Sequence, residues 1–245
     1  MHIDQEMSLM EHLLELRSRL IKAVLALVIT TSLSWVLVEP VLLIINRPLG
    51  DVLLQAITPT ETILVYMRVM LILGVTMAMP VIVYQGIRFL LPALLEHEKK
   101  YLNILIPGAT VCFATGVTFA LLVMIPGMVM FMQSFLVRIV ENRWTLHNYV
   151  SFVTFVMFWM GILFQMPLVI FFLAKLNIVT HKQLAGSRRW AILVSSIVAA
   201  IVTPSHDPIN MFILMIPLVL LFEIGTFLSR FAHPDEEEET EALTA

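Results

Sequence analysis

Residues 149–174 read YVSFVTFVMFWMGILFQMPLVIFFLA, a stretch that contains no charged side chain. A helix of about 20 apolar residues crosses the hydrocarbon core of a bilayer, so this stretch predicts a membrane span. The whole chain has the same character: 59% of its 245 residues are hydrophobic, 13% are charged, and the mean hydropathy is +0.92. Soluble domains carry about 25% charged residues. The composition therefore predicts an integral membrane protein, with the lipid bilayer as a partner.

Further apolar segments on both sides of this stretch predict an all-α, polytopic fold with six transmembrane helices. The last two segments each hold only about fourteen apolar residues before a charged group, which makes them short for a bilayer. Such a pair forms either a re-entrant hairpin or two short spans in a thinned membrane, and the anchors Arg188-Arg189 and His206-Asp207 favour the second. The predicted spans are residues 20–38, 63–84, 102–125, 149–174, 190–203 and 209–227.

The two ends of the chain are expected to differ from the spans. Leucines at 9, 13, 16 and 20 recur at three- and four-residue spacing, which predicts an amphipathic helix that lies at the interface and runs into the first span. Glu39-Pro40 is expected to end that span, because proline breaks the helical hydrogen bonding. We expect residues 1–230 to form a single membrane domain and residues 231–245 to form an acidic, disordered tail.

Lysine and arginine fall mainly on one side of the predicted spans. By the positive-inside rule, this asymmetry predicts that both termini are cytoplasmic. Arg68, near the outer end of the second span, is expected to reach the headgroups. The inner segments hold Arg17, Arg19, Lys22, Arg88, Lys99, Lys100, Lys175, Lys182, Arg188, Arg189 and Arg230, whereas the outer segments hold Arg47, Arg68, Arg138 and Arg143.

Several classes of protein are disfavoured. A net charge of −3 offers no basic surface for nucleic acid. The sequence has no nucleophile elbow, zinc helix or phosphate-binding loop, its seven histidines lack ligand spacing, and Cys112 is its single cysteine, so neither an enzyme nor a metal or other cofactor is predicted. A proton- or metabolite-coupled small-molecule transporter is the alternative, although a charged or broken-helix site at mid-membrane is expected there.

Two acidic clusters are predicted on the cytoplasmic side. Glu11, Glu15 and Arg19 share one helical face, where they form either a surface ion-pair ladder or a carboxylate site for a basic ligand. Glu98 belongs to the second cluster, which is either a solvated helix start or a second part of that site. Together the two clusters could accept charge-assisted hydrogen bonds from a pair of arginines, for which lysine would be a poorer match.

Two polar residues interrupt the later spans. Gln165 lies between Phe164 and Pro167, and an amide in lipid needs a hydrogen-bond partner, either on a neighbouring helix or at a carbonyl that the proline frees. Glu223 closes the sixth span, where it either pairs with a basic neighbour or serves a functional role.

Short motifs run in order from about His12 to Arg230. In their order and in the predicted topology they resemble the TatC family, the multi-span receptor subunits of twin-arginine protein translocases. The motifs are HLLELRSR at 12–19, TPTE at 58–61, PVIVYQ at 80–85, PAL at 92–94, HEKK at 97–100, GVTF at 116–119, FQMP at 164–167, RR at 188–189, TP at 203–204, IP at 216–217 and FE at 222–223.

The resemblance implies a receptor and core component that binds twin-arginine signal peptides of folded cargo proteins at the cytoplasmic face and organises their export, driven by the proton gradient. In TatC-like proteins, carboxylates matching Glu15 and Glu98 hold the arginine pair. The remaining residues of this chain that the resemblance places in the patch are His12, Leu16, Arg17 and Arg19.

The resemblance also implies partners and a location. Single-span subunits of the TatA or TatB type would dock along spans five and six in an oligomeric complex, in the cytoplasmic membrane of a prokaryote. Glutamine replaces the glutamate that is common at position 165, which argues against an obligatory proton relay there but leaves a polar contact for a partner helix or inserted signal peptide. The residues implied in such contacts are Phe164, Gln165, Pro167 and Glu223, and those in the outer cap and turns are Pro48, Glu61 and Asp207.

Overall fold

The computed structural model describes residues 9–50, 52–90, 102–135, 144–203 and 207–232, and the regular elements in these ranges are helical. The prediction of an all-α fold is therefore confirmed. The elements are α1 (Leu9–Leu33), η1 (Ser34–Leu37), α2 (Val38–Asn46), η2 (Arg47–Leu49), α3 (Pro59–Leu90), α4 (Leu102–Phe119), the π turn η5 (Ala120–Met124), α5 (Ile125–Ser134), α6 (Leu146–Leu163), α7 (Met166–Lys175), α8 (His181–Gly186), α9 (Arg188–Val202), α10 (Pro208–Ser229) and η6 (Arg230–Ala232).

Within the described ranges, five helical stretches are long and apolar enough to cross a membrane: Met10–Leu49, Pro59–Gly86, Leu105–Ser134, Leu146–Lys175 and Pro208–Ala232. The predicted fifth segment forms α9, whose 15 residues rise about 22 Å. The prediction that the sixth segment is also short is wrong, because α10 does not end at Glu223: it runs from Pro208 to Ser229, and its 22 residues rise about 33 Å.

The prolines interrupt the helices less than the sequence indicates. The first helical segment breaks at η1, before Pro40, which lies in the first turn of α2, where its missing N–H costs no hydrogen bond. The third segment does not end at residue 125 as predicted, because the π turn at 120–124 accommodates Pro126 and α5 continues to Ser134. Pro80 lies inside α3 without ending it, as the predicted span 63–84 implies.

The two ends of the described chain compare differently with the predictions. α1 is continuous from Leu9 to Leu33, as expected for a helix that runs into the first span. The tail was predicted to begin at residue 231, but Arg230–Ala232 form a 3-10 turn and Ala232 is buried. Its carbonyl accepts a hydrogen bond from Lys175 of α7. The rest of the predicted tail, residues 233–245, lies outside the described residues.

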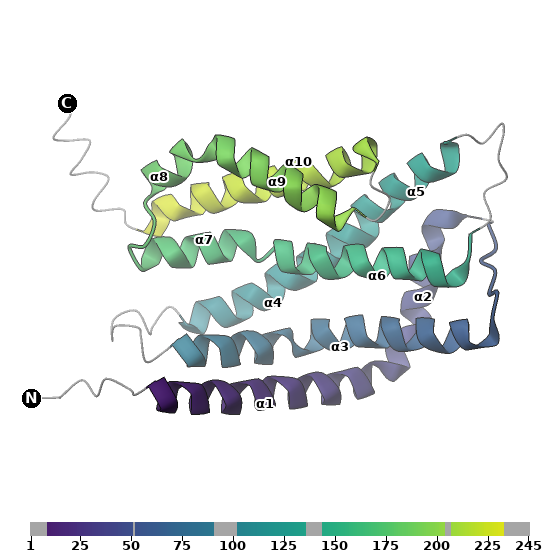
Figure 1. Ribbon diagram of the computed structural model, residues 1–245, viewed down its shortest axis with the longest axis horizontal. Coiled ribbons are helices and arrows are strands. Elements are labelled where there is room, and N and C mark those ends of the chain that lie inside the picture. The colour runs from purple at the N-terminus through teal and green to yellow at the C-terminus, as the bar shows by residue number, and fades with distance from the viewer. Residues whose placement is uncertain (1–8, 51, 91–101, 136–143, 204–206, 233–245) are drawn as a thin grey trace, which may run out of the picture.

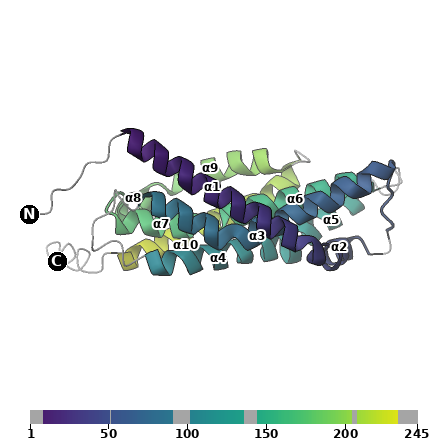
Figure 2. The ribbon, with the colours of Figure 1, turned by 90° about the horizontal axis from the view of Figure 1, so that it is seen from below.

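The long helices run roughly along one axis. Both ends of the described chain lie at the same end of this axis. α1 lies along α3 at one edge, α6 packs on the other side of α3, and α7 packs on α10, which forms the other edge together with α9 (Figures 1 and 2). The start of α1, the end of α3 and the end of α10 lie at the same end of the molecule, at the left in Figure 1. α2 and the start of α6 lie at the opposite end.

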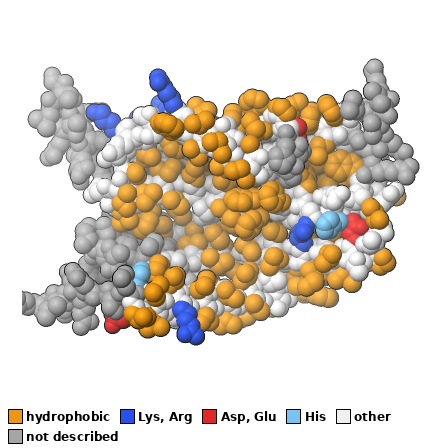
Figure 3. Space-filling view, viewed as in Figure 1, with side chains coloured by type: hydrophobic (Ala, Val, Ile, Leu, Met, Phe, Trp, Pro, Cys, Tyr) orange, Lys and Arg blue, Asp and Glu red, His pale blue; other side chains and the backbone are white. Residues whose placement is uncertain are grey.

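The core lies where α3, α4, α5 and α6 meet. Phe113, Met128, Tyr149 and Met157 are almost fully buried there. Gly161 lies so close to Phe113 that a Cβ on it would come within 2.6 Å of that ring. Large apolar side chains also cover the outside, as Figure 3 shows for one face, where the charged side chains lie mainly towards the two ends. Such a surface suits a protein surrounded by lipid.

The backbones of α1 and α3 lie close together, and side-chain hydrogen bonds to backbone carbonyls join the two helices. Thr30 Oγ1 donates to Gly74 O at 2.8 Å, and Ser34 Oγ donates to Met70 O at 2.7 Å. A Cβ on Gly74 would lie 2.6 Å from the Cα of Thr31. Only a residue without a side chain therefore allows this helix pair to approach so closely.

We expect Gly74→Ala to separate α1 from α3 and to destabilise the protein by about 2 kcal/mol or more, because a backbone atom cannot move aside. Gly86→Ala in the same helix is the matched control, since a Cβ there meets no atom within 4 Å. Thermal unfolding in detergent checks this: the Tm should fall for Gly74→Ala and stay unchanged or rise for Gly86→Ala. Equal Tm values for the two variants would show that the close approach of α1 and α3 at Gly74 does not limit stability.

Candidate functional site

The predicted carboxylate site on α1 contains an ion pair. Arg19 donates to Glu15 Oε1 from Nη2 at 3.0 Å and from Nε at 3.3 Å. Both side chains are only about a fifth exposed, at 21% for Arg19 and 19% for Glu15. Because both bonds end on Oε1, the second oxygen of Glu15 is not used by Arg19. The carboxylate therefore holds one guanidinium and keeps an oxygen for another donor.

The end of α3 forms a second wall beside this pair. Gln85 is buried, and its Oε1 lies 3.5 Å from Arg19 Nη1. One turn further, the ring of Phe89 stacks on His12, with ring centroids 4.3 Å apart. These five residues, His12, Glu15, Arg19, Gln85 and Phe89, are named the α1–α3 polar cluster below.

Sequence reasoning missed Gln85 and Phe89 as members of the site. In the sequence, Gln85 stands out only as the last residue of the motif PVIVYQ, at the end of the second span. A signal was present, because an amide in an apolar helix needs a hydrogen-bond partner. The sequence could not indicate that this partner is Arg19, 66 residues away along the chain.

The other residues predicted for this patch have different positions. Leu16 and Arg17 are exposed on α1 and lie outside the polar cluster. Glu98 lies in the range 91–101, outside the described residues. Arg88 of α3 donates to the Tyr84 hydroxyl at 2.9 Å and lies over that ring, 5.4 Å from its centroid.

The polar cluster is suited to a ligand that donates hydrogen bonds and carries positive charge. Carboxylate and amide oxygens accept from guanidinium, whose planar fork of donors matches a carboxylate better than an ammonium does. The position at one end of two long helices makes the cluster reachable from that side of a membrane. Among the described residues, no three His, Cys, Asp or Glu side chains are arranged to hold a metal ion.

Glu223 pairs with a basic neighbour, which is one of the two readings that the sequence allowed. Arg188 Nε lies 2.8 Å from Glu223 Oε1, and Arg188 Nη2 donates to Oε2 at 3.0 Å. The pair is bidentate and joins the start of α9 to α10. Both side chains are well exposed, so the expected stabilisation is about 0–1 kcal/mol.

Gln165 occupies the break between α6 and α7 and joins it to α4. Its Nε2 donates to Ala109 O of α4 at 3.1 Å and to Gly161 O at 3.3 Å. The backbone N–H of Gln165 turns instead to Ile162 O, which leaves the Gly161 carbonyl for the side chain. The expected interhelical bond is therefore present. The second carbonyl is not the one freed by Pro167, whose missing N–H would serve Leu163, but the Gly161 carbonyl, which is freed by the turn of the Gln165 backbone.

Phe164 and Pro167 belong to the internal packing of the same break. The ring of Phe164 lies 5.4 Å from that of Phe119. Pro167 is buried, and a Cβ on Gly225 of α10 would lie 3.2 Å from its Cα. Gln165 and Glu223 have separate partners, so the structure does not bring these predicted contact residues into one site.

Glu61 organises the opposite end of the molecule. Its Oε2 accepts from the backbone N–H of Ile57 at 2.8 Å, and its Oε1 accepts from that of His147 at 2.5 Å. The segment before α3 is thereby tied to the start of α6, beside a short bridge between Gln55 and Thr145.

Asp207 and Pro48 are structural in a similar way. Asp207 caps α10 by accepting from the backbone N–H of Asn210 at 2.8 Å. Pro48 is half-buried within η2, next to buried Leu49.

Comparison with known proteins gives one consistent result. The family model of TatC, described as Sec-independent protein translocase protein, matches residues 11–217. The Sec-independent protein translocase protein TatC of Carboxydothermus hydrogenoformans is 32% identical over 235 residues, which cover 95% of this chain and 97% of that protein. The protein of the same description from Aquifex aeolicus is 33% identical over 238 residues, covering 95% and 98%.

Solved structures show the same similarity. A crystal structure described as the twin arginine translocase receptor TatC superimposes with a TM-score of 0.79 at 33% identity, covering 91% of this chain and 99% of that chain. A second crystal structure of the same description, in DDM, has a TM-score of 0.80 and covers 89% and 99%. The similarity thus extends over nearly the whole fold.

The bonds of Gln165 lead to a stability prediction. Gln165→Met keeps the length of the side chain but leaves the carbonyls of Ala109 and Gly161 without this donor, so we expect a loss of about 1–3 kcal/mol and a lower Tm in detergent. Ile162→Met, at an exposed neighbour, is the control and should leave the Tm unchanged. A Gln165→Met protein as stable as the control would contradict the structural role of the amide.

Proposed function

The chain belongs to the TatC family of Sec-independent protein translocase proteins, and from this premise we propose that it is the receptor and core subunit of such a translocase. In this role it binds the twin-arginine signal peptides of folded cargo proteins at the cytoplasmic face and organises their export, with the proton gradient as the energy source. The family consists of translocase components and is not a family of enzymes.

The α1–α3 polar cluster is the observation that supports the receptor role most directly. Glu15 already accepts two hydrogen bonds from a guanidinium within the chain. An incoming arginine could therefore bind the second oxygen of Glu15 or exchange with Arg19, and Gln85 supplies a further acceptor close by. Glu98 is proposed as the second carboxylate for the arginine pair. Arg17 and Leu16 would contribute to the exposed rim.

The same geometry supports a placement of the chain in the membrane. The start of α1 and the end of α10 lie at one end of the molecule together with the polar cluster. Since most lysines and arginines of the sequence fall on this side of the spans, we place this end in the cytoplasm. The proposed topology has six spans, with α9 as the short fifth one, in the cytoplasmic membrane of a prokaryote.

Single-span subunits of the TatA or TatB type are the proposed membrane partners, docked along α9 and α10. Large apolar side chains such as Trp190, Ile201, Phe212 and Ile216 are exposed on these helices, which supports a lateral contact with lipid or another helix. Gln165 is proposed as a structural link within the chain, because both of its amide protons are used on backbone carbonyls. This arrangement does not favour the small-molecule transporter, because the amide of Gln165 is used within the chain and is no charged site at mid-membrane.

A binding experiment tests the receptor role. Signal peptides with an Arg-Arg or a Lys-Lys pair are titrated onto the purified protein in detergent or nanodiscs, and the Kd is measured by fluorescence anisotropy. We expect the Lys-Lys peptide to bind at least tenfold more weakly, because it loses bidentate hydrogen bonds worth about 1.5–3 kcal/mol each. Equal affinity for the two peptides would contradict the proposal.

Substitution of the carboxylate gives a sharper test. Glu15→Gln and Glu98→Gln are each expected to weaken binding of the Arg-Arg peptide by about 10- to 100-fold, since a neutral amide loses the charge-assisted bond. Glu39→Gln removes an exposed acid of α2 at the opposite end and should not change the Kd. If all three variants bind like the wild type, the assignment of the site is wrong.

A further inference from the structure

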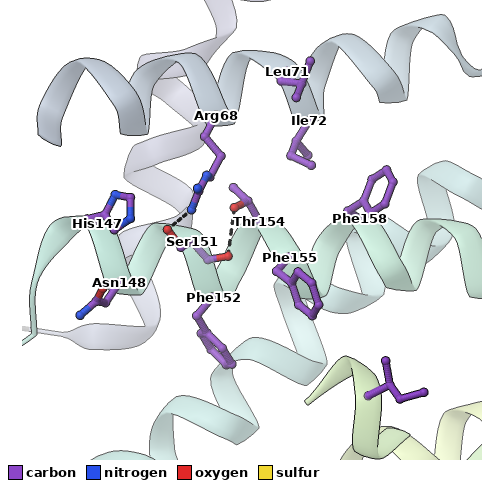
Figure 4. A pocket seen from close by; sticks show the side chains of 11 residues that line it. Arg68, Leu71, Ile72, His147, Asn148, Ser151, Phe152, Thr154, Phe155 and Phe158 are labelled. Atoms are coloured by element: carbon purple, nitrogen blue, oxygen red, sulfur yellow. Dashed lines mark hydrogen bonds between the residues drawn. The ribbon is translucent and has the colours of Figure 1, made fainter. Parts of the chain in front are cut away.

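A cavity of about 820 Å³ lies between α3, α6 and α9, far from the α1–α3 polar cluster. Arg68, which lines it, precedes Gln85 by 17 residues, about 25 Å along α3. One part of the lining is polar, formed by Arg68, His147, Asn148 and Ser151, and the remainder is mainly apolar, formed by Leu71, Ile72, Phe152, Phe155, Phe158 and Ile201, with Thr154 among them. In Figure 4, Arg68 reaches from α3 towards Ser151 of α6, while Phe155 and Phe158 lie further along α6.

Arg68 has donors left for an anion. Its Nη1 donates to the hydroxyl of Ser151, but a guanidinium has five N–H groups. Among the described residues, no carboxylate forms an ion pair with Arg68. Glu61, an acid at this end, lines an adjacent hollow of about 360 Å³, and its oxygens accept backbone N–H groups.

The surroundings of Arg68 are those of a lipid-facing helix surface. Leu64, Met67 and Leu71, its neighbours on α3, are all about half exposed. A cation on such a surface is costly unless an anion or water compensates it. An anion beside Arg68 would remove this cost and also use the remaining donors.

The depth of Arg68 points to the source of that anion. α3 begins at Pro59, but its first apolar residue after Glu61 and Thr62 is Ile63. Arg68 lies five residues beyond Ile63, about 7.5 Å along the helix. At this depth a long cationic side chain reaches the phosphates of the lipid headgroups. The apolar part of the cavity continues from there towards the middle of the helices, along Phe155 and Phe158.

We propose that this cavity binds one anionic phospholipid of the leaflet opposite the α1–α3 polar cluster. Its phosphate accepts hydrogen bonds from Arg68, with His147 and Asn148 beside it, and an acyl chain fills the phenylalanine-lined part. The cavity volume falls in the range of about 300–1,000 Å³ that is usual for ligand sites. The cavity is charged at Arg68 and apolar along the rest of its lining, so it matches a ligand with a charged headgroup and an apolar chain. A free anion would contact only Arg68 and its polar neighbours.

Native mass spectrometry of the full chain in detergent tests this proposal. The protein is given equal amounts of phosphatidylglycerol and phosphatidylcholine with the same acyl chains, and the lipids that stay bound are counted. We expect one phosphatidylglycerol to be retained, with at least a tenfold preference over phosphatidylcholine. Arg68→Gln should lose this preference, whereas Arg47→Gln, at an exposed arginine of the same end that does not line the cavity, should keep it.

A second variant keeps the test decisive if Arg68→Gln does not fold. Ile201 lines the cavity and is exposed, so Ile201→Trp can narrow the cavity without changing any charge, and we expect at least a tenfold loss of bound phosphatidylglycerol. Inorganic phosphate is the third arm, and it should not displace the lipid. The proposal is overturned if both cavity variants retain phosphatidylglycerol like the wild type, if phosphatidylcholine binds equally, or if inorganic phosphate displaces the lipid. The proposal is also overturned if Arg68→Gln or Ile201→Trp keeps phosphatidylglycerol but no longer co-purifies with a partner subunit. That result would show that the cavity is a protein contact.

Discussion

The need to satisfy every polar group without water is the constraint on which this structure depends. In a bilayer the backbone can do so only as helix, and any polar side chain among the helices must find its own partner. Thr30, Ser34 and Gln165 all solve this in one way, by donating to a backbone carbonyl of a neighbouring helix. The same bonds hold the helices together, because apolar surfaces facing lipid gain little from association.

Charged groups are kept at the two ends of the helices, where they connect different segments. At one end Arg19 joins Glu15 and Gln85, and Arg188 joins Glu223. At the other end Glu61 gathers backbone N–H groups from two segments. The first of these groupings supports a receptor site because a carboxylate already accommodates a guanidinium there. Glu15, Arg19 and Gln85 therefore join α1 to α3 and also form the proposed binding site.

The helices on the α9 side of the molecule are short or interrupted: α9 has 15 residues, and α6 and α7 are separated by a break at Gln165. On the other side, α3 is a single 32-residue helix. The break at Gln165 lets α7 approach α10, where Pro167 lies against Gly225. Helix ends near prolines were the weakest part of the sequence reasoning. The predicted third span stops at residue 125, whereas a π turn accommodates Pro126 and the helical stretch continues; Pro80 lies inside α3, within the predicted second span.

The sequence by itself determined the all-helical class, the approximate positions of the long apolar helices, the short α9 and the helical face that Glu15 shares with Arg19, because hydropathy and local charge patterns need no tertiary information. Only the tertiary structure decided that Gln85 and Phe89 join Glu15, that Glu223 is paired with Arg188, and that Arg68 borders a cavity. These contacts join residues that lie tens of positions apart along the chain. Their formation depends on how the helices pack, and periodicity within one segment carries no information about that packing.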